Sequence, residues 1–344
     1  MLCRAVLRII GVVILAFALL GVSMAAEQAT RKAATPHLLW EVAVSGEILS
    51  ASLAPGGACG VAVTGTDVVV VDRDGVVRWQ RELLEMDRNA SRAVTAVSPT
   101  CDWVAAWLHT ASGGVQVLHR NTGRVIALDR ISTYDLWTQP TLRTSPDGKL
   151  LAIGANLNQL LLVASDGVVI KRISVSDDDD GVKVAFTSDS RRVVITGRWH
   201  IGVANISGEW VWRRDVELRE IYPNNDATQA AIAQDGGFAA FVGSTNQDMP
   251  PETWIVDGKG RVIATRRGSG SETLVGISGR CLLFRRAISQ SETDLILRDR
   301  RLAEIVRIRG APNGALSAED VTHQNGVMLD YPGPTLRAYE LPPC

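Results

Sequence analysis

A repeated turn-and-strand unit is the feature that most constrains how this chain of 344 residues can fold. Six turn segments, each followed by an apolar strand, have their middle residues at positions 56, 100, 147, 189, 235 and 279. The intervals are therefore 44, 47, 42, 46 and 44 residues, and a seventh unit with a weaker turn occupies 313–341. Regular spacing on this scale indicates a repeat architecture in which each unit buries its faces only against its neighbours.

Each unit contains four short strands rich in Val, Ile and Trp, separated by Gly, Asp and Pro clusters. In the first unit these strands are Ile48–Leu53, Gly60–Thr64, Val68–Val71 and Val76–Gln80. Four antiparallel strands in about 40–50 residues are typical of a propeller blade. The sequence therefore predicts an all-β fold, namely a seven-bladed β-propeller of four-stranded antiparallel blades.

The two ends of the repeat region predict how such a ring closes. The segment His37–Val44 resembles the outer strand Val77–Leu83 but precedes the first inner strand, so it has no blade of its own. The last unit has room for only three strands, at Leu316–Val321, Gly326–Leu329 and Leu336–Leu341. We expect the N-terminal strand to pair into the last blade, which leaves no sheet edge at the seam. Residues 37–344 would then form a single domain.

Several hairpins carry motifs that resemble known propeller repeats. Asp72–Trp79 and Asn205–Trp212 are similar to the D-x-x-G-x-x-x-W turn of the PQQ-like repeat family. Arg120–Arg124 resembles that family's T-G-K/R turn without its Trp, and Ser145–Lys149 is similar to the SPDG turn of WD40-type and related periplasmic propellers. The G-H and W-D dipeptides of WD40 units are missing. The resemblance spans nearly the whole mature chain and implies a bacterial exported propeller.

The first 25 residues have the layout of a secretory signal peptide. Arg4 and Arg8 precede the uncharged run Ile9–Val22, and Ser23 and Ala25 supply the small residues that a signal peptidase reads. We expect cleavage after position 25, a linker over 26–36, and an exported protein, either periplasmic or extracellular. An uncleaved membrane anchor is the alternative, because the apolar stretch approaches spanning length.

Four cysteines remain after the signal: Cys59, Cys101, Cys281 and Cys344. An even number in an exported protein permits disulfides. The first three each follow a turn and open an apolar strand, which is the usual place for a small buried hydrophobic residue. This placement argues against a disulfide framework, and the absence of a CxxC spacing argues against a zinc site.

The loops between second and third strands and those between blades meet on one rim of a propeller, which is where such rings most often bind ligands. This rim mixes aromatic and hydrogen-bonding groups, as recognition surfaces do, although any propeller would have polar loops. The residues that we predict to bind there are His109, Trp137, Asn156, Arg198, Trp199, His200, Tyr222 and Asn246.

Two rim features invite a chemical interpretation. In the acidic run at 177–180, Asp178 and Asp180 are weak candidates for Ca²⁺ ligands, but the D-x-D-x-D-G spacing is not met and a solvated loop is favoured. The histidines at 109 and 200 could act as general acids or bases, yet neither has a catalytic or metal-binding neighbour in sequence. Trp40, Trp79 and Trp212, at matching outer-strand positions, are assigned to packing between blades.

The sequence favours a non-enzymatic scaffold, a monomer, that binds a protein or peptide partner on the rim, with no cofactor. The PQQ-like resemblance implies an assembly scaffold similar to the PQQ-like propeller of the outer-membrane assembly machinery. A sugar- or small-ligand-binding sensor that uses the central channel is one alternative. A quinone-dependent oxidoreductase is another, but the adjacent cysteine pair of the quinoprotein dehydrogenases is absent. The 36 basic and 37 acidic residues nearly balance, which excludes nucleic acid as a partner and limits membrane contact to a retained anchor.

Overall fold

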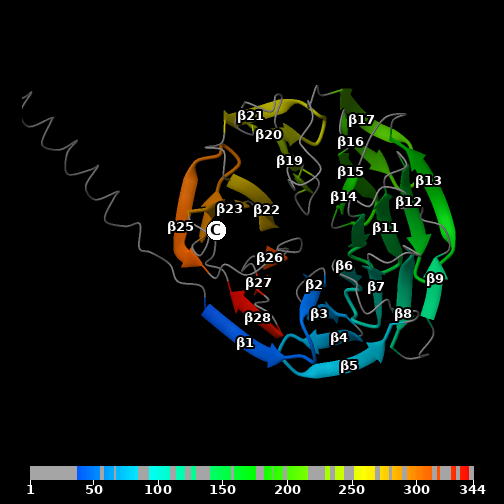
Figure 1. The fold of residues 1–344 in the computed structure, drawn as a ribbon. Helices are drawn as coiled ribbons and strands as arrows, with labels where there is room; N and C mark the ends of the chain where they lie inside the picture. Colours follow the sequence, from blue (N-terminus) through cyan, green and yellow to red (C-terminus); the bar gives the residue numbers. More distant parts are fainter. Residues whose placement is uncertain are drawn as a thin grey trace, which may run out of the picture.

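The protein is all-β, and its strands form small sheets that follow one another in a circle (Figure 1). The computed structural model describes residues 37–54, 58–65, 67–83, 93–108, 114–120, 125–128, 140–155, 159–175, 182–187, 189–196, 200–215, 229–232, 237–243, 252–267, 272–278, 281–288, 293–311, 316–317, 327–330 and 334–340. Within these ranges no helix is present, and the strands make seven sheets of four antiparallel strands each. The all-β class and the four-stranded antiparallel repeat are therefore confirmed, and the arrangement is compatible with a β-propeller.

We number the sheets 1 to 7 along the chain. Sheets 1 to 6 each use four consecutive strands, ordered from the inner to the outer strand in Figure 1. Sheet 1 contains β2 (Ile48–Leu53), β3 (Cys59–Thr64), β4 (Asp67–Asp72) and β5 (Val77–Glu82); sheet 2 contains β6 (Ala93–Val97), β7 (Trp103–Leu108), β8 (Val115–His119) and β9 (Val125–Leu128); sheet 3 contains β10 (Thr141–Thr144), β11 (Leu150–Ala155), β12 (Gln159–Ala164) and β13 (Val169–Ser174).

The remaining sheets follow the same order except at the seam. Sheet 4 contains β14 (Lys183–Phe186), β15 (Arg192–Thr196), β16 (His200–Asn205) and β17 (Trp210–Asp215); sheet 5 contains β18 (Gln229–Ile232), β19 (Phe238–Gly243), β20 (Glu252–Asp257) and β21 (Val262–Arg267); sheet 6 contains β22 (Glu272–Ser278), β23 (Cys281–Ala287), β24 (Thr293–Arg298) and β25 (Glu304–Ala311); sheet 7 contains β26 (Leu316–Ser317), β27 (Val327–Asp330), β28 (Thr335–Glu340) and β1 (His37–Ala43).

Runs of apolar residues form the middle strands because both of their faces are covered. Every residue of β3, β7 and β24 is buried, whereas β13, at the outer edge of sheet 3, buries only Ile173. A strand covered on both faces has no polar side to alternate with, so β3 and β7 are almost continuously hydrophobic. The equally buried β24 also contains Thr293, Asp294 and Arg298. Outer strands face solvent and carry polar residues.

Hydrophobic clusters fill the interfaces between consecutive sheets. Seven such clusters lie among the described residues, and the seventh joins sheet 7 to sheet 1. The first strands of neighbouring sheets also contact one another from β2 through β22, and β26 contacts β2. Representative cluster members are Val61 with Val104 (sheets 1 and 2), Trp107 with Ile153 (2 and 3), Leu162 with Ile195 (3 and 4), Val203 with Phe241 (4 and 5), Phe238 with Phe284 (5 and 6), Leu297 with Tyr339 (6 and 7), and Leu329 with Val71 (7 and 1).

At the seam, β1 pairs antiparallel with β28, from His37 opposite Glu340 to Ala43 opposite Thr335. The expected pairing of the N-terminal strand with the last unit is therefore present. Across it, the Arg337 guanidinium donates to Glu41 at 2.7 Å. The first and last parts of the described chain thus share one sheet.

Candidate functional site

The residues predicted on the loop rim fall outside the described ranges, with one exception. His200 is the first residue of β16 and pairs with Asp215 of β17. The binding role assigned to the rim therefore stays a prediction. The predicted positions that lie outside the described residues are His109, Trp137, Asn156, Arg198, Trp199, Tyr222, Asn246, Asp178 and Asp180, together with the signal peptide at 1–25 and the linker at 26–36.

Turns between first and second strands use a side-chain hydroxyl to organise the backbone. The Ser145 hydroxyl accepts from the amide of Leu150 at 2.9 Å and donates to Asp147 Oδ1 at 2.6 Å. Thr187 repeats the arrangement one sheet later, where its hydroxyl donates to Asp189 Oδ1 at 2.6 Å. Asp side chains are favoured in turns because they hydrogen-bond the local backbone. The Asp of the SPDG turn is therefore part of the turn structure.

The same contacts act on the acidity of both carboxyl groups. Burial raises the pKa of Asp147, but hydrogen bonds from the Ser145 hydroxyl and the Lys149 amide outweigh it, so the pKa lies below its ordinary value of 3.8. For Asp189, the hydrogen bond from the Thr187 hydroxyl is the main cause of a lowered pKa. Both groups are ionised at neutral pH and serve as hydrogen-bond acceptors.

Tryptophan side chains connect two turns between first and second strands, at Cys101 and Gly148, to the preceding sheet. Trp79 Nε1 of sheet 1 donates to the carbonyl of Cys101 at 3.0 Å, and Trp103 Nε1 of sheet 2 donates to the carbonyl of Gly148 at 3.2 Å. Cys101 and Gly148 stand at equivalent turn positions and both have a positive φ. The packing role predicted for Trp79 is confirmed, and its ring also makes a hydrogen bond between sheets.

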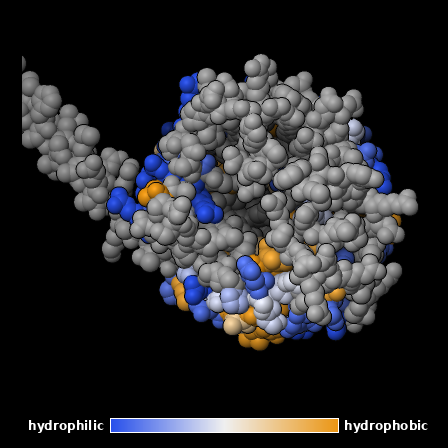
Figure 2. Space-filling model, viewed as in Figure 1, coloured by the Kyte–Doolittle hydropathy of each residue, from blue (hydrophilic) through white to orange (hydrophobic). Residues whose placement is uncertain are grey.

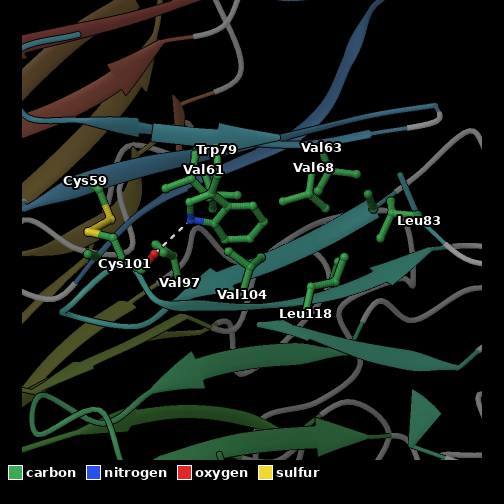
Figure 3. Packing of buried hydrophobic residues seen from close by; sticks show 14 of the residues in the cluster. Cys59, Val61, Val63, Val68, Trp79, Leu83, Val97, Cys101, Val104 and Leu118 are labelled. Carbon is green, nitrogen blue, oxygen red and sulfur yellow. Dashed lines mark hydrogen bonds between the residues drawn. A yellow bond between two sulfur atoms is a disulfide. The ribbon is translucent and has the colours of Figure 1, made fainter. Parts of the chain in front are cut away.

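A disulfide joins Cys59 of sheet 1 to Cys101 of sheet 2 (Figure 3). The sequence left open whether any cysteines pair, and the argument from their placement against a disulfide framework is wrong for this pair. Their Cα atoms lie 6.2 Å apart, within the range that a disulfide spans. The two cysteines stand 42 residues apart, close to the repeat spacing, so consecutive sheets bring them to the same interface. The match between the cysteine spacing and the repeat spacing was the sequence signal that could have predicted this disulfide. Cys281 is disulfide-bonded as well.

The turns between third and fourth strands explain the D-x-x-G motif. Asp72 Oδ1 accepts hydrogen bonds from two amides of its turn, at 2.9 and 3.0 Å. Gly75 has φ +82°, and a Cβ there would lie 2.8 Å from the Cβ of Trp40 in the neighbouring sheet. Gly260 is matched in the same way against the ring of Trp212. The motif therefore seats a tryptophan from the preceding sheet, which confirms the packing role of both residues.

In the turns above, a glycine of the turn contacts a tryptophan of the preceding sheet. In sheet 6 the sizes are reversed, so that the turn holds the large residue. Leu302 occupies the glycine position of its turn with φ +64°, and its amide donates to the carbonyl of Asp299 at 2.9 Å. Leu302 is buried in a cluster against which Ala264 packs, and Ala264 stands at the outer-strand position that is Trp79 in β5 and Trp212 in β17. Because the outer-strand residue is small, the turn can hold a large one.

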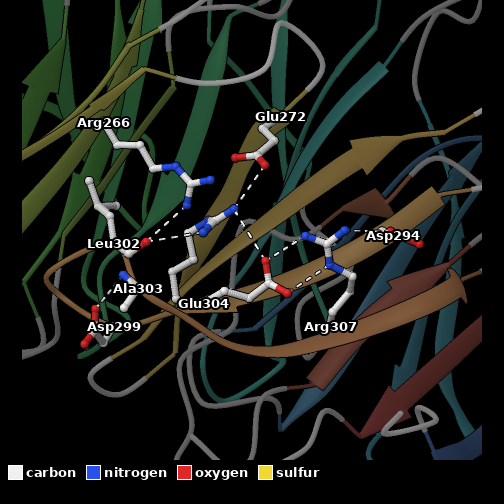
Figure 4. Close-up of polar contacts among 9 residues, drawn as sticks. Arg266, Glu272, Asp294, Asp299, Leu302, Ala303, Glu304 and Arg307 are labelled. Atoms are coloured by element: carbon white, nitrogen blue, oxygen red, sulfur yellow. Dashed lines mark hydrogen bonds and ion pairs between the residues drawn. The ribbon is translucent and has the colours of Figure 1, made fainter. Parts of the chain in front are cut away.

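A charged network surrounds the Leu302 carbonyl (Figure 4). That oxygen accepts from Arg266 at 3.1 Å and from Arg298 at 3.2 Å. The Arg298 side chain is 2% exposed, and its Nη2 donates to Glu272 at 3.0 Å and lies 3.9 Å from Glu304. Burying a charge is costly unless it is paired, and here each of these charged groups has a partner.

Arg307 extends the network along the outer strand of sheet 6. It forms a two-point contact with Glu304, at 2.7 and 2.9 Å, and lies 3.6 Å from Asp294. The hydrogen bond with Glu304 is the main reason that the pKa of Arg307 is raised. The network stabilises sheet 6 and its contact with sheet 5.

The outer strands present a mixed apolar and basic surface. In Figure 2 apolar and hydrophilic residues lie side by side over the outer strands, with an apolar patch over β1 and β5. We define the outer edge as β5, β13, β17, β21 and β25 with the turn residues that precede them. Its large exposed hydrophobic residues are Val76, Val77, Val168, Val169, Ile170, Ile206, Val211, Val262, Ile263 and Ile305.

The outer edge is also locally basic. Its five strands contain ten Arg or Lys residues and three Asp or Glu residues, although the whole chain is nearly neutral. Exposed aliphatic residues beside cations form a surface suited to binding an acidic partner. The basic residues are Arg78, Arg81, Lys171, Arg172, Arg213, Arg214, Arg266, Arg267, Arg307 and Arg309; the acidic ones are Glu82, Asp215 and Glu304.

Comparison with known proteins gives no match to a protein-family model or to a curated protein. In the part of the chain that the structure describes, no helix has the length and apolar character needed to cross a membrane. The same residues contain no group of three or more His, Cys, Asp or Glu side chains placed to hold a metal ion.

Proposed function

We propose that the chain is an exported seven-bladed β-propeller that acts as a non-enzymatic scaffold and binds a protein or peptide partner. Support for the ring comes from the clusters between consecutive sheets, because the cluster of Leu329 and Val71 places the last sheet against the first. The pairing of β1 with β28 supports closure by the N-terminal strand. The D-x-x-G-x-x-x-W turns support a PQQ-like repeat.

The observation that carries the binding role is the outer edge. Exposed aliphatic residues recur there beside cations in five sheets. Such patches mark sites of protein interaction. Five of the described carboxylates have structural roles. Asp72, Asp147 and Asp189 accept hydrogen bonds within their turns, and Glu272 and Glu304 pair with arginines.

Export is supported by two features. The first 25 residues have the layout of a signal peptide. The Cys59–Cys101 disulfide is compatible with an oxidising compartment, where such bonds persist. We therefore place the scaffold in the periplasm or outside the cell.

The test is to purify the mature chain, cross-link it in the exporting cell, and reconstitute any captured protein with it at defined stoichiometry. A saturable complex would support the scaffold. Melting curves with quinone plus Ca²⁺, and with a panel of sugars, test the other functions, because a bound ligand raises the melting temperature by mass action. A rise with quinone and Ca²⁺, or with a sugar, and no protein complex would contradict the proposal. If a protein complex forms, its affinity for the Trp199→Ala variant would show whether the predicted loop rim contributes to binding of the partner.

A further inference from the structure

The outer strand of sheet 3, β13, is exposed over most of its length, as is β5 of sheet 1. Five of its six residues are exposed, and only Ile173 is buried. Val168, just before it, is 56% exposed, and Ile170 is 50% exposed. β13 ends its sheet, so within the described residues one side of its backbone has no strand beside it.

A β-bulge lies at the exposed start of β13, and the same register shift occurs in β5, β17 and β21. Lys171 pairs with Leu162 and Val169 pairs with Val163, so Ile170 is an extra residue with no partner on β12. A bulge turns the strand locally and re-aims the side chains at that point. The residues that follow, from Lys171 to Ser174, keep a regular register with β12. The exposed aliphatic residues Val168–Ile170 are thus followed directly by a regular strand edge at Lys171–Ser174.

The cations of β13 are available to a partner, unlike several of their equivalents. Arg266 of β21 donates to the Leu302 carbonyl, and Arg307 of β25 pairs with Glu304. Among the described residues, neither Lys171 nor Arg172 forms an ion pair. Lys171 lies over Gly208 of sheet 4, and β13 contains no acidic residue.

We propose that β13 is a docking edge for an extended segment of a partner protein with alternating acidic and aliphatic residues, which adds as a fifth strand to sheet 3. This inference rests on the proposed scaffold function and names the partner's chemistry. Main-chain hydrogen bonds along Lys171–Ser174 supply affinity, and contacts to Val169 and Ile170 anchor the aliphatic side chains. Lys171 and Arg172 select acidic residues.

The same two cations would oppose pairing of this edge with a second copy of the chain. Charged side chains on an edge strand protect it from pairing with another copy. A second β13 would bring like charges together, whereas an acidic strand would bring opposite ones. An anionic lipid surface would also meet the cations, but it has no groups to match the backbone of Lys171–Ser174. The exposed edge therefore favours a peptide.

The test measures binding of a fluorescent synthetic peptide of alternating Glu and Val or Ile residues to the full mature chain by anisotropy. A peptide with Lys in place of Glu is the charge control. A third peptide carries N-methyl groups on the amides of one edge, so that it keeps its side chains but cannot form a strand ladder. The protein variants are Lys171→Glu with Arg172→Glu, and, as a matched exposed control on β21, Arg267→Glu.

We expect the acidic peptide to bind, the double variant to bind it at least about tenfold more weakly, and the control variant to bind it nearly as well as the natural chain. The N-methylated peptide should also lose about tenfold or more. Equal binding of the Lys peptide, or an unchanged affinity of the double variant, would overturn the proposal. Binding to phosphatidylglycerol vesicles that the double variant loses, without peptide binding, would assign the edge to a membrane instead. If a captured partner still binds the double variant, this proposal fails while the scaffold function stands.

Discussion

The disulfide between sheets 1 and 2 makes a quantitative prediction about stability. Cys59 and Cys101 are separated by 42 residues, so the bond restricts a long loop of the unfolded chain. The loop-entropy relation gives about 4 kcal/mol of stabilisation for a loop of this length. Both side chains are also buried, at 1% and 0% exposure, so their removal costs packing as well.

The perturbation is the double variant Cys59→Ala, Cys101→Ala, and the assay is urea unfolding followed by fluorescence. Reduction alone is not specific, because Cys281 is disulfide-bonded too. We therefore compare the variant with the natural chain in oxidising and in reducing buffer. The variant should be less stable by about 4–5 kcal/mol under oxidising conditions and by about 1 kcal/mol under reducing ones. The same difference in both buffers would show that the bond does not form or does not contribute.

Three further changes test other contacts. Arg298→Met removes the guanidinium that pairs with the largely buried Glu272, whereas Glu304 keeps Arg307. It should lower the free energy of unfolding by about 3–5 kcal/mol in urea titrations. Arg301→Met, at an exposed turn position, should change it by less than about 0.5 kcal/mol, and similar effects of the two variants would contradict the network. Gly260→Ala places a methyl group against a tryptophan ring at φ +80° and should cost about 1–3 kcal/mol in the same titration; no loss would show that the ring does not occupy that position. Because the pKa values of Asp147 and Asp189 are lowered, the two ionised carboxylates stabilise the fold above the ordinary pKa of 3.8, and this stabilisation is lost as the pH falls through their folded-state pKa values. Replacing both residues with Asn should therefore flatten the fall of the melting temperature below about pH 4. An unchanged pH profile would count against the role of these carboxylates as turn caps.

The strand repeat could be predicted from sequence because local signals and long-range packing agree. Runs such as Val68–Val71 bounded by Asp and Gly clusters form strands in the structure, here β4 within Asp67–Asp72. The unmatched N-terminal strand was informative because β-sheet edges require partners, and β1 does pair with β28. Trp40 and Trp212 were assigned correctly because matching positions in a repeat have matching environments.

Contacts between units were harder to predict. The Cys59–Cys101 pair depends on two neighbouring sheets placing equivalent residues face to face, which the cysteine spacing alone does not encode. The network around Arg298 was missed because its partners come from separate strands and from a turn in which Leu302 replaces the usual glycine. The loop-rim residues carry no repeated pattern, and their roles stay predictions.

The central claim is that seven sheets form a ring which the N-terminal strand closes, and a cross-link across the seam tests it most directly. Glu41 and Arg337 lie opposite each other in the β1–β28 pair. Cysteines introduced at both positions should oxidise to an intramolecular disulfide that peptide mass mapping identifies. Glu41→Cys combined with Lys259→Cys, in a turn of sheet 5, should give none. A Glu41–Arg337 pair of cysteines that stays reduced in the folded protein, or that links no better than the control, would contradict closure of the ring.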